Sequence, residues 1–145
     1  MFKKILVPVD GSETAWRALN NALEIGKKFE SEILVVNVIQ PYNNAALLAV
    51  PLDHATINHG NSELEKVGDK VLELAKEMVG SYPHKVEYDM EVGHPSERII
   101  ALSKKVEADA IVLGSRGLSG IAEFFLGSVS SKVSQYATVP VLIVK

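Results

Sequence analysis

Short apolar runs alternate along the chain with longer segments in which apolar residues recur at helical spacing. The runs at 3–9, 32–39 and 110–113 are almost continuously apolar, as expected for strands that are buried on both faces of a parallel sheet. The run at 85–92 alternates apolar and polar residues, which predicts an edge strand with one solvated face. A fifth apolar run, 140–144, lies near the end of the chain.

Between these runs, apolar positions three and four residues apart predict helices. The first helix follows the turn Asp10-Gly11-Ser12-Glu13. The second is predicted to begin at a capping box, Ser62 to Glu65, and to end at Gly80. Pro95 suits the first turn of a third helix, and Ser128 is the candidate N-cap of a fourth.

Strands that alternate with helices predict an α/β protein, a single domain over residues 1–145 with a doubly wound, five-stranded parallel sheet. Strand order 3-2-1-4-5 places the alternating third strand at an edge and makes the first and fourth strands neighbours at the topological switch point. Ligands bind at such a point, beyond the carboxyl ends of the strands. Asp10 and Gly114, which follow these two strands, are therefore expected to flank one crevice.

Residues 40–61 contain two prolines, four asparagines and two histidines without a sustained period, which predicts a loop. His54 and His59 are five positions apart, so they do not form a helical ligand pair. Together with Asp53 they offer metal-ligating side chains, but solvated loop histidines are the simpler interpretation.

Composition and charge exclude several classes of partner and of chemistry. A net charge of −3 with interspersed lysine and glutamate argues against a nucleic-acid partner or an anionic membrane, which would need a basic face. The absence of cysteine excludes disulfides and thiolate chemistry and suits a reducing cytoplasm. No run approaches the roughly 18 apolar residues of a membrane span, and ILVPV is too short for a signal-peptide core. We therefore expect a soluble, cytoplasmic protein with no membrane partner.

The stretch 108–131 is richest in candidate chemistry, because an apolar run ends there at Gly114 and a glycine- and serine-rich segment follows. Gly114, Gly117 and Gly127-Ser128 are separated by two and nine residues. The first N–H groups of a helix have no internal partner, and glycine lets an anion approach them. The spacing does not fit a Walker A loop, and no G-x-G-x-x-G occurs. The alternative is that these glycines serve only in turns.

The pattern G-x2-G-x9-G-[ST], read from Gly114 to Ser128, resembles the nucleotide-binding signature of the universal stress protein family (UspA-like), in its ATP-binding branch. KKILVPVDGS, VGHPSERII and VPVLIVK extend the resemblance over nearly the whole chain, and residues 40–61 do not match. The family has an adenine nucleotide alpha-hydrolase-like (Rossmann-like) fold, in agreement with the architecture predicted above. The resemblance implies an ATP-binding protein, with Mg²⁺ accompanying ATP, that acts as a binder or switch in the stress response.

The resemblance also implies roles for individual positions. Adenine would lie against Val9 and Val38, the latter through its backbone, and the ribose and the metal-phosphate region would lie near Asp10. The complete nucleotide-binding set that it implies is Pro8, Val9, Asp10, Val38, Gly114, Arg116, Gly117, Gly127, Ser128, Val129 and Ser130. Asp10 is also the possible metal ligand, through Mg-ATP. From the residues alone, Asp10 could equally be an N-cap paired with Glu13 in a capping box.

No catalytic residue is predicted. Phosphoryl transfer needs a positioned lysine, base or arginine finger, and none is evident, so we expect at most weak ATP hydrolysis. One alternative is a dimeric interaction module of the same fold with little or no nucleotide binding. Another is an enzyme of the alpha-hydrolase group, but its G-G-x-D-S-type loop is absent, because Val9-Asp10-Gly11-Ser12 stands there.

The fifth strand predicts self-association. Val141, Leu142, Ile143 and Val144 are all apolar, and an uncovered edge of this kind invites pairing with another chain. Two copies related by a two-fold axis would pair antiparallel, and the dimers of the family resemble this arrangement. We therefore expect a homodimer through residues 140–144.

Overall fold

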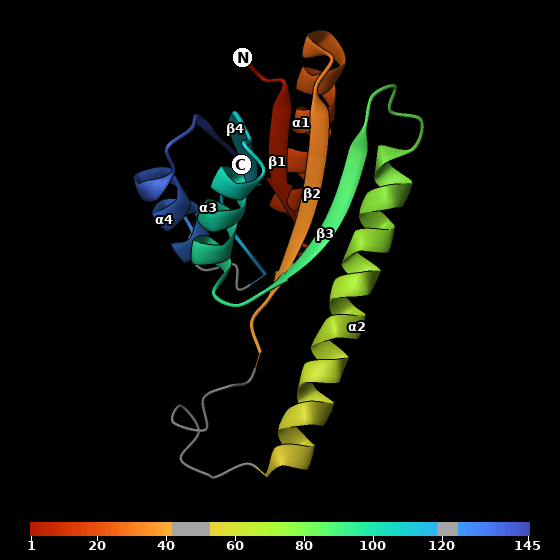
Figure 1. Cartoon of the computed structure of the whole chain (residues 1–145), viewed down its shortest axis with the longest axis vertical. Helices are drawn as coiled ribbons and strands as arrows, with labels where there is room; N and C mark the ends of the chain where they lie inside the picture. The colour runs from red at the N-terminus through yellow and green to blue at the C-terminus, as the bar shows by residue number, and fades with distance from the viewer. Residues whose placement is uncertain (42–52, 119–124) are drawn as a thin grey trace.

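The structure is a computed structural model that describes residues 1–41, 53–118 and 125–145. Its strands form one parallel sheet with the order β3-β2-β1-β4-β5, which confirms the predicted α/β, Rossmann-like architecture (Figure 1). Along the chain the elements are β1 (Lys4–Pro8), α1 (Glu13–Phe29), β2 (Glu32–Ile39), α2 (His54–Val79), β3 (Val86–Val92), α3 (Pro95–Lys105), β4 (Ala110–Gly114), α4 (Ser128–Tyr136) and β5 (Val141–Val144).

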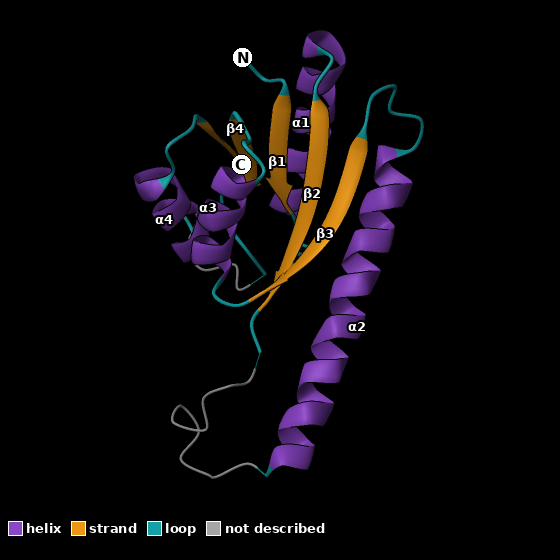
Figure 2. Cartoon of the chain, in the orientation of Figure 1, coloured by secondary structure: helices purple, strands orange, loops and turns teal. Residues whose placement is uncertain are grey.

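The helices cover both faces of the sheet, α1 and α2 on one side and α3 and α4 on the other (Figure 2). Successive residues of a strand point to opposite faces, so β1 sends Ile5 and Val7 into the core beneath α1 and Leu6 into the core beneath α3. This explains why the central strands read as continuous apolar runs. The strands β3 and β5 lie at the two edges, as predicted.

The start of α2 was predicted wrongly. The helix begins at His54 rather than at Ser62, and Asp53 is its N-cap, with a carboxylate that accepts a hydrogen bond from the N–H of Thr56 at 2.7 Å. Hydrogen bonds from Thr56 lower the pKa of Asp53. The buried residues of α2 begin only at Gly68, and its amino-terminal half extends past the sheet in Figure 1. Because that half packs on little else, its sequence shows no apolar period.

The histidines of the predicted 40–61 loop therefore lie on a helix, and residues 42–52 of that loop fall outside the described residues. Among the residues that the structure describes, no group of three histidine, aspartate or glutamate side chains is placed to hold a metal ion. In the same residues, no helix is both long enough and apolar enough to cross a membrane.

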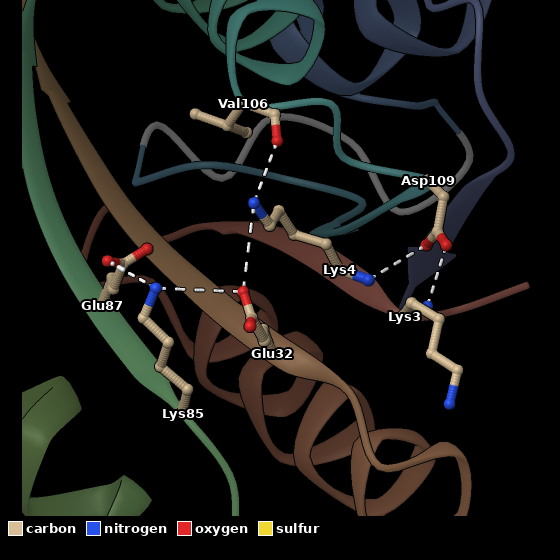
Figure 3. Close-up of polar contacts among 7 residues, drawn as sticks. All are labelled: Lys3, Lys4, Glu32, Lys85, Glu87, Val106 and Asp109. Carbon is tan, nitrogen blue, oxygen red and sulfur yellow. Dashed lines mark hydrogen bonds and ion pairs between the residues drawn. The ribbon is translucent and has the colours of Figure 1, made fainter.

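At the amino end of the sheet, charged groups pair with one another (Figure 3). The carboxylate of Asp109 accepts hydrogen bonds from the N–H groups of Lys3 at 2.8 Å and Lys4 at 3.3 Å. The ammonium of Lys4 donates to the carbonyl of Val106 at 3.1 Å and lies 3.9 Å from the carboxylate of Glu32. The ammonium of Lys85 contacts both Glu32, at 3.9 Å, and Glu87, at 2.9 Å.

Candidate functional site

A cavity of about 190 Å³ lies at the opposite, carboxyl end of the sheet, where β1, β2 and β4 end. A single water needs only about 15 Å³, so this space can hold a small organic group. All the nucleotide-binding residues predicted from the sequence line it: Pro8, Val9, Asp10, Val38, Gly114, Arg116, Gly117, Gly127, Ser128, Val129 and Ser130. Asp10 and Gly114 thus flank one crevice, as the strand order predicts.

The turn after β1 presents the carboxylate of Asp10 at the cavity. Ser12, rather than Asp10, is the N-cap of α1, because its side chain accepts a hydrogen bond from the N–H of Ala15 at 3.3 Å. One carboxylate oxygen of Asp10 accepts a hydrogen bond from the N–H of Ser12 at 2.9 Å. Glu13 pairs with Arg17 and does not complete a capping box. The N-cap interpretation of Asp10 is therefore wrong, and its carboxylate is held by the turn instead.

The end of β2 offers an open backbone donor and acceptor. The N–H of Val9 donates to the carbonyl of Val36 at 2.8 Å, so Val36 faces β1. Backbone groups two residues apart on a strand face the same neighbour, so Val38 also faces β1, which has ended there. Within the described residues, this leaves the N–H and C=O of Val38 open toward the cavity that Val38 lines.

The side chain of Asn37 lies beside this open backbone. Its side-chain amide donates to the carbonyl of Val9 at 2.8 Å, where a longer β1 would receive the N–H of Val38. Asn37 is only 5% exposed, and its Oδ1 has no hydrogen-bond partner in the described structure. That oxygen faces α2 at Gly68, where a Cβ would lie 2.8 Å from it. A polar residue inside a buried strand needs a hydrogen-bond partner, but the sequence does not indicate which one.

The loop after β4 turns its carbonyl oxygens toward neighbouring donors. The carbonyl of Ser115 accepts hydrogen bonds from the N–H of Gly127 and the hydroxyl of Ser130, both at 2.8 Å. The carbonyl of Arg116 accepts from the hydroxyl of Thr14 at 2.7 Å. Two oxygens that would repel an anion are therefore fixed by donors from α1 and from the start of α4.

The first turn of α4 supplies donors to the same cavity. Gly127 is its N-cap and Ser128 is the first helical residue, so the predicted cap is displaced by one position. The N–H of Ser131 begins the intrahelical ladder by donating to the carbonyl of Gly127. The N–H groups of Ser128, Val129 and Ser130 have no partner among the described residues, as expected for a helix amino end.

The glycines of the cradle are required for space rather than for unusual backbone angles. Among the described glycines, positive φ occurs at Gly11, Gly80 and Gly93, and not at the cradle glycines. A Cβ at Gly117 would lie 3.0 Å from a carboxylate oxygen of Asp10, and one at Gly127 would lie 3.3 Å from the carbonyl of Ser115. Side chains at these positions would fill the space beside the free N–H groups, so the residues present fit a bound phosphate chain.

Gly114 has a different role. A Cβ there would lie 2.5 Å from the hydroxyl oxygen of Thr14 and 2.8 Å from the backbone nitrogen of Ala15, so this glycine lets α1 pack directly on the end of β4. The first glycine of the pattern therefore serves the packing of the fold. The second and third keep the cradle open.

The charged side chains that line the cavity are those of Asp10 and Arg116. Neither forms an ion pair with another group in the described part of the chain. Sequence reasoning missed five apolar lining residues: Ala15, Val36, Pro95, Ile99 and Leu113. Pro95 and Ile99 begin α3 beside the carboxyl end of β3, and that position is the signal by which they could have been found.

Comparison with known proteins supports the fold described above and identifies its family. The model of the universal stress protein family matches residues 1–145. Among curated relatives, universal stress protein YxiE of Bacillus subtilis is 37% identical, and the alignment covers 100% of both chains. Universal stress protein Sll1388 of Synechocystis is also 37% identical, over 99% of this chain and 98% of the relative.

Solved structures of similar proteins share the fold. The protein MJ0577 of Methanocaldococcus jannaschii superposes with a TM-score of 0.82 at 30% identity, over 100% of this chain and 96% of that one. The universal stress protein of Archaeoglobus fulgidus in complex with dAMP has a TM-score of 0.72 at 23% identity, over 100% of both chains. A universal stress protein in complex with cAMP has a TM-score of 0.73 at 24% identity, over 99% of this chain and 97% of the other. From the match over its whole length, this chain belongs to the universal stress protein family.

Proposed function

We propose that the cavity binds an adenine nucleotide, with ATP and its Mg²⁺ as the principal form, and that the protein acts in the cytoplasm as a nucleotide-dependent binder or switch in the stress response. The observation that carries the proposal is the amino end of α4. Three N–H groups that have no partner among the described residues lie there beside glycines, and the neighbouring carbonyl oxygens of Ser115 and Arg116 are held by other donors. A site of this kind favours an anion over water or a neutral group.

The other end of the cavity supports adenine as the base. Val38 offers one backbone donor and one acceptor side by side, and the pairing edge of adenine carries an amino donor beside a ring-nitrogen acceptor. Guanine presents a carbonyl acceptor where adenine has its amino group. This acceptor would face the carbonyl of Val38, which is also an acceptor, and no hydrogen bond would form between them. The complexes of two relatives with dAMP and cAMP agree with this choice of base.

Mg²⁺ bound with the phosphates would neutralise part of their charge, and Asp10 is the carboxylate available to it in the cavity. Apart from Arg116, the described lining offers no other charged side chain, and nothing there is placed as a general base. We therefore propose binding with at most weak hydrolysis.

The test is mass spectrometry of small molecules released when the purified protein is denatured, followed by calorimetric titration with ATP and GTP in the presence of Mg²⁺. We expect an adenylate in the released fraction and a dissociation constant for ATP at least tenfold below that for GTP. A flavin in the released fraction, or no heat of binding with Mg-ATP, would contradict the proposal and favour an interaction module that works without nucleotide.

We also propose that the protein forms a homodimer through the open edge of β5. The carbonyl of Pro140 accepts from Ile111 and that of Val144 accepts from Ser115, so residues 140, 142 and 144 face β4. The backbone groups of Val141 and Ile143 therefore point outward, and the side chain of Leu142 is 42% exposed. Two copies could satisfy these outward groups in an antiparallel pair.

The substitution Ile143→Pro tests the edge. Proline at 143 removes an outward donor and leaves the bonds to β4 intact, whereas Leu142→Pro removes a donor within the sheet and serves as the destabilising control. In sedimentation at micromolar concentration, the wild type should be a dimer and the Ile143→Pro protein a folded monomer. A monomeric wild type, or a dimer that withstands Ile143→Pro, would exclude this interface.

A further inference from the structure

Thr14 contacts the phosphate cradle from a distant part of the sequence. It lies in the first turn of α1 and is only 7% exposed. Its hydroxyl donates to the carbonyl of Arg116 at 2.7 Å, and the hydroxyl of Ser12 lies 3.4 Å from the same oxygen. The shorter of these two hydrogen bonds is the one from Thr14.

The carbonyl of Arg116 belongs to the same planar peptide as the N–H of Gly117, and in a trans peptide the two groups point in opposite directions. The structure contains no cis peptide in its described residues. Holding the carbonyl against α1 therefore fixes the N–H of Gly117 on the other side, away from Thr14. That N–H has no partner in the described residues, and Gly117 lines the cavity.

The peptide needs such a restraint because of the residue that follows it. Reversing a peptide changes ψ of the residue before it and φ of the residue after it, and glycine accepts the new φ without a steric penalty. A reversed Arg116–Gly117 peptide would replace a donor with a carbonyl oxygen, which repels an anion. The preceding peptide is held independently, by Gly127 and Ser130 at the carbonyl of Ser115.

We propose that Thr14 is a positioning residue for phosphate binding: its hydroxyl holds the Arg116–Gly117 peptide in the orientation that offers an N–H, rather than a carbonyl oxygen, to the phosphates. The inference rests on the proposed nucleotide function, in which Gly117 belongs to the nucleotide-binding set, and it concerns how the N–H of Gly117 is held. It predicts that the hydroxyl matters for the charged part of the ligand and not for the nucleoside.

The test compares Thr14→Val, which keeps the shape and removes the hydroxyl, with Thr14→Ser, which keeps the hydroxyl. Dissociation constants for ATP and for adenosine are measured by calorimetry with each folded protein. We expect Thr14→Val to weaken ATP binding about tenfold, the effect of one lost hydrogen bond, and to leave adenosine binding unchanged within error. Thr14→Ser should restore the affinity for ATP.

One control variant and one spectroscopic measurement separate positioning from general loosening of the fold. Ser103→Ala removes another buried hydroxyl, which donates to the carbonyl of Ile100 on the other side of the sheet, and should not change either affinity. Thr14→Ala replaces the valine variant if that protein does not fold. In NMR spectra, addition of ATP should shift the Gly117 amide of the wild type strongly and that of Thr14→Val weakly.

The outcomes distinguish this inference from the function on which it rests. If the wild type binds no ATP, both are wrong. If the wild type binds ATP and Thr14→Val binds it equally well, the role of Thr14 is wrong and the proposed function stands. If Thr14→Val weakens ATP and adenosine alike, or if Thr14→Ser does not restore binding, Thr14 is merely structural and the inference is overturned.

Discussion

The two ends of the sheet differ in whether their polar groups are paired within the protein. At the amino end, Lys4, Glu32, Lys85 and Asp109 are paired with one another or with backbone groups (Figure 3). At the carboxyl end, the N–H groups that open α4 have no partner in the described chain, and the carbonyls beside them are turned to other donors. The same sheet thus has one end at which charged groups pair within the protein and one end at which backbone donors are open to a ligand.

This difference teaches where to look for function in a small α/β protein. Exposed ion pairs contribute little to stability and indicate nothing about ligands. Backbone donors without a protein partner at a helix amino end can receive an anion, so a cluster of them beside a cavity is informative. Four predictions test the contrast, in order of decreasing expected effect.

Gly114→Val should have the largest effect, because it damages the frame that holds the carboxyl end together. The new side chain would collide with Thr14 and Ala15, whose atoms lie under 3.0 Å from the position of a Cβ. We expect a loss of about 3 kcal/mol in the free energy of unfolding, together with loss of nucleotide binding. Urea denaturation measures the first effect, and wild-type stability in this variant would contradict the packing role of Gly114.

Gly127→Val and Gly117→Val should separate binding from folding. Each adds a side chain beside the free N–H groups, at 3.0 to 3.3 Å from the nearest atom, where a small adjustment of the neighbours is enough. We expect ATP affinity to fall by about tenfold to a hundredfold, while stability changes by about 1 kcal/mol or less. Unchanged calorimetric affinity in both variants would mean that the phosphates lie elsewhere.

Asp10→Asn should have a smaller effect that depends on the metal. Asparagine can still accept the hydrogen bond from Ser12, so stability should remain close to that of the wild type, and Asp10→Ala, which cannot, provides the comparison. Affinity for ATP should fall about tenfold with Mg²⁺ present and less in its absence. Equal losses of stability in both variants, with full affinity, would assign Asp10 to the turn alone.

Lys85→Met at the amino end should have the smallest effect. Its ion pairs are exposed, so we expect no resolvable change in stability at neutral pH and none in ATP affinity. Pairing with Glu87, and to a lesser degree with Glu32, raises the pKa of Lys85. Any stabilisation is therefore present at neutral pH and is lost as pH rises through this raised pKa, so wild type and variant should converge in alkali. A change in nucleotide affinity would break the contrast between the two ends.

Much of the fold could be predicted from the sequence, because burial on both faces leaves a direct record in β1, β2 and β4 as continuous apolar runs. The start of α2 could not, because its first turns bury almost nothing and so carry no apolar period. The caps of α1 and α4 were misplaced by one or two residues, because Asp10 and Ser12, or Gly127 and Ser128, are all acceptable cap types.

The candidate site, too, was predictable in part. Its glycine spacing is a local pattern, and strand order brought Asp10 to the same cavity. The contacts of Thr14 and Asn37 were not predicted, because each joins a side chain to a backbone carbonyl in another segment and so has no periodic signature in the sequence. The type of a side chain alone does not indicate which backbone carbonyl will accept its hydrogen bond.

Asn37 affects stability and the proposed ligand site in opposite directions. A laboratory selection for heat resistance alone would favour an apolar residue at 37, because a buried oxygen without a partner lowers stability by about 1–3 kcal/mol. The carbonyl of Val9 would then be free to pair with the N–H of Val38, which would lengthen the ladder between β1 and β2. Such a protein would be more stable and would have lost the open donor that we propose for recognition of the base. Asparagine at 37 therefore makes the sheet less stable and leaves its edge open to a ligand.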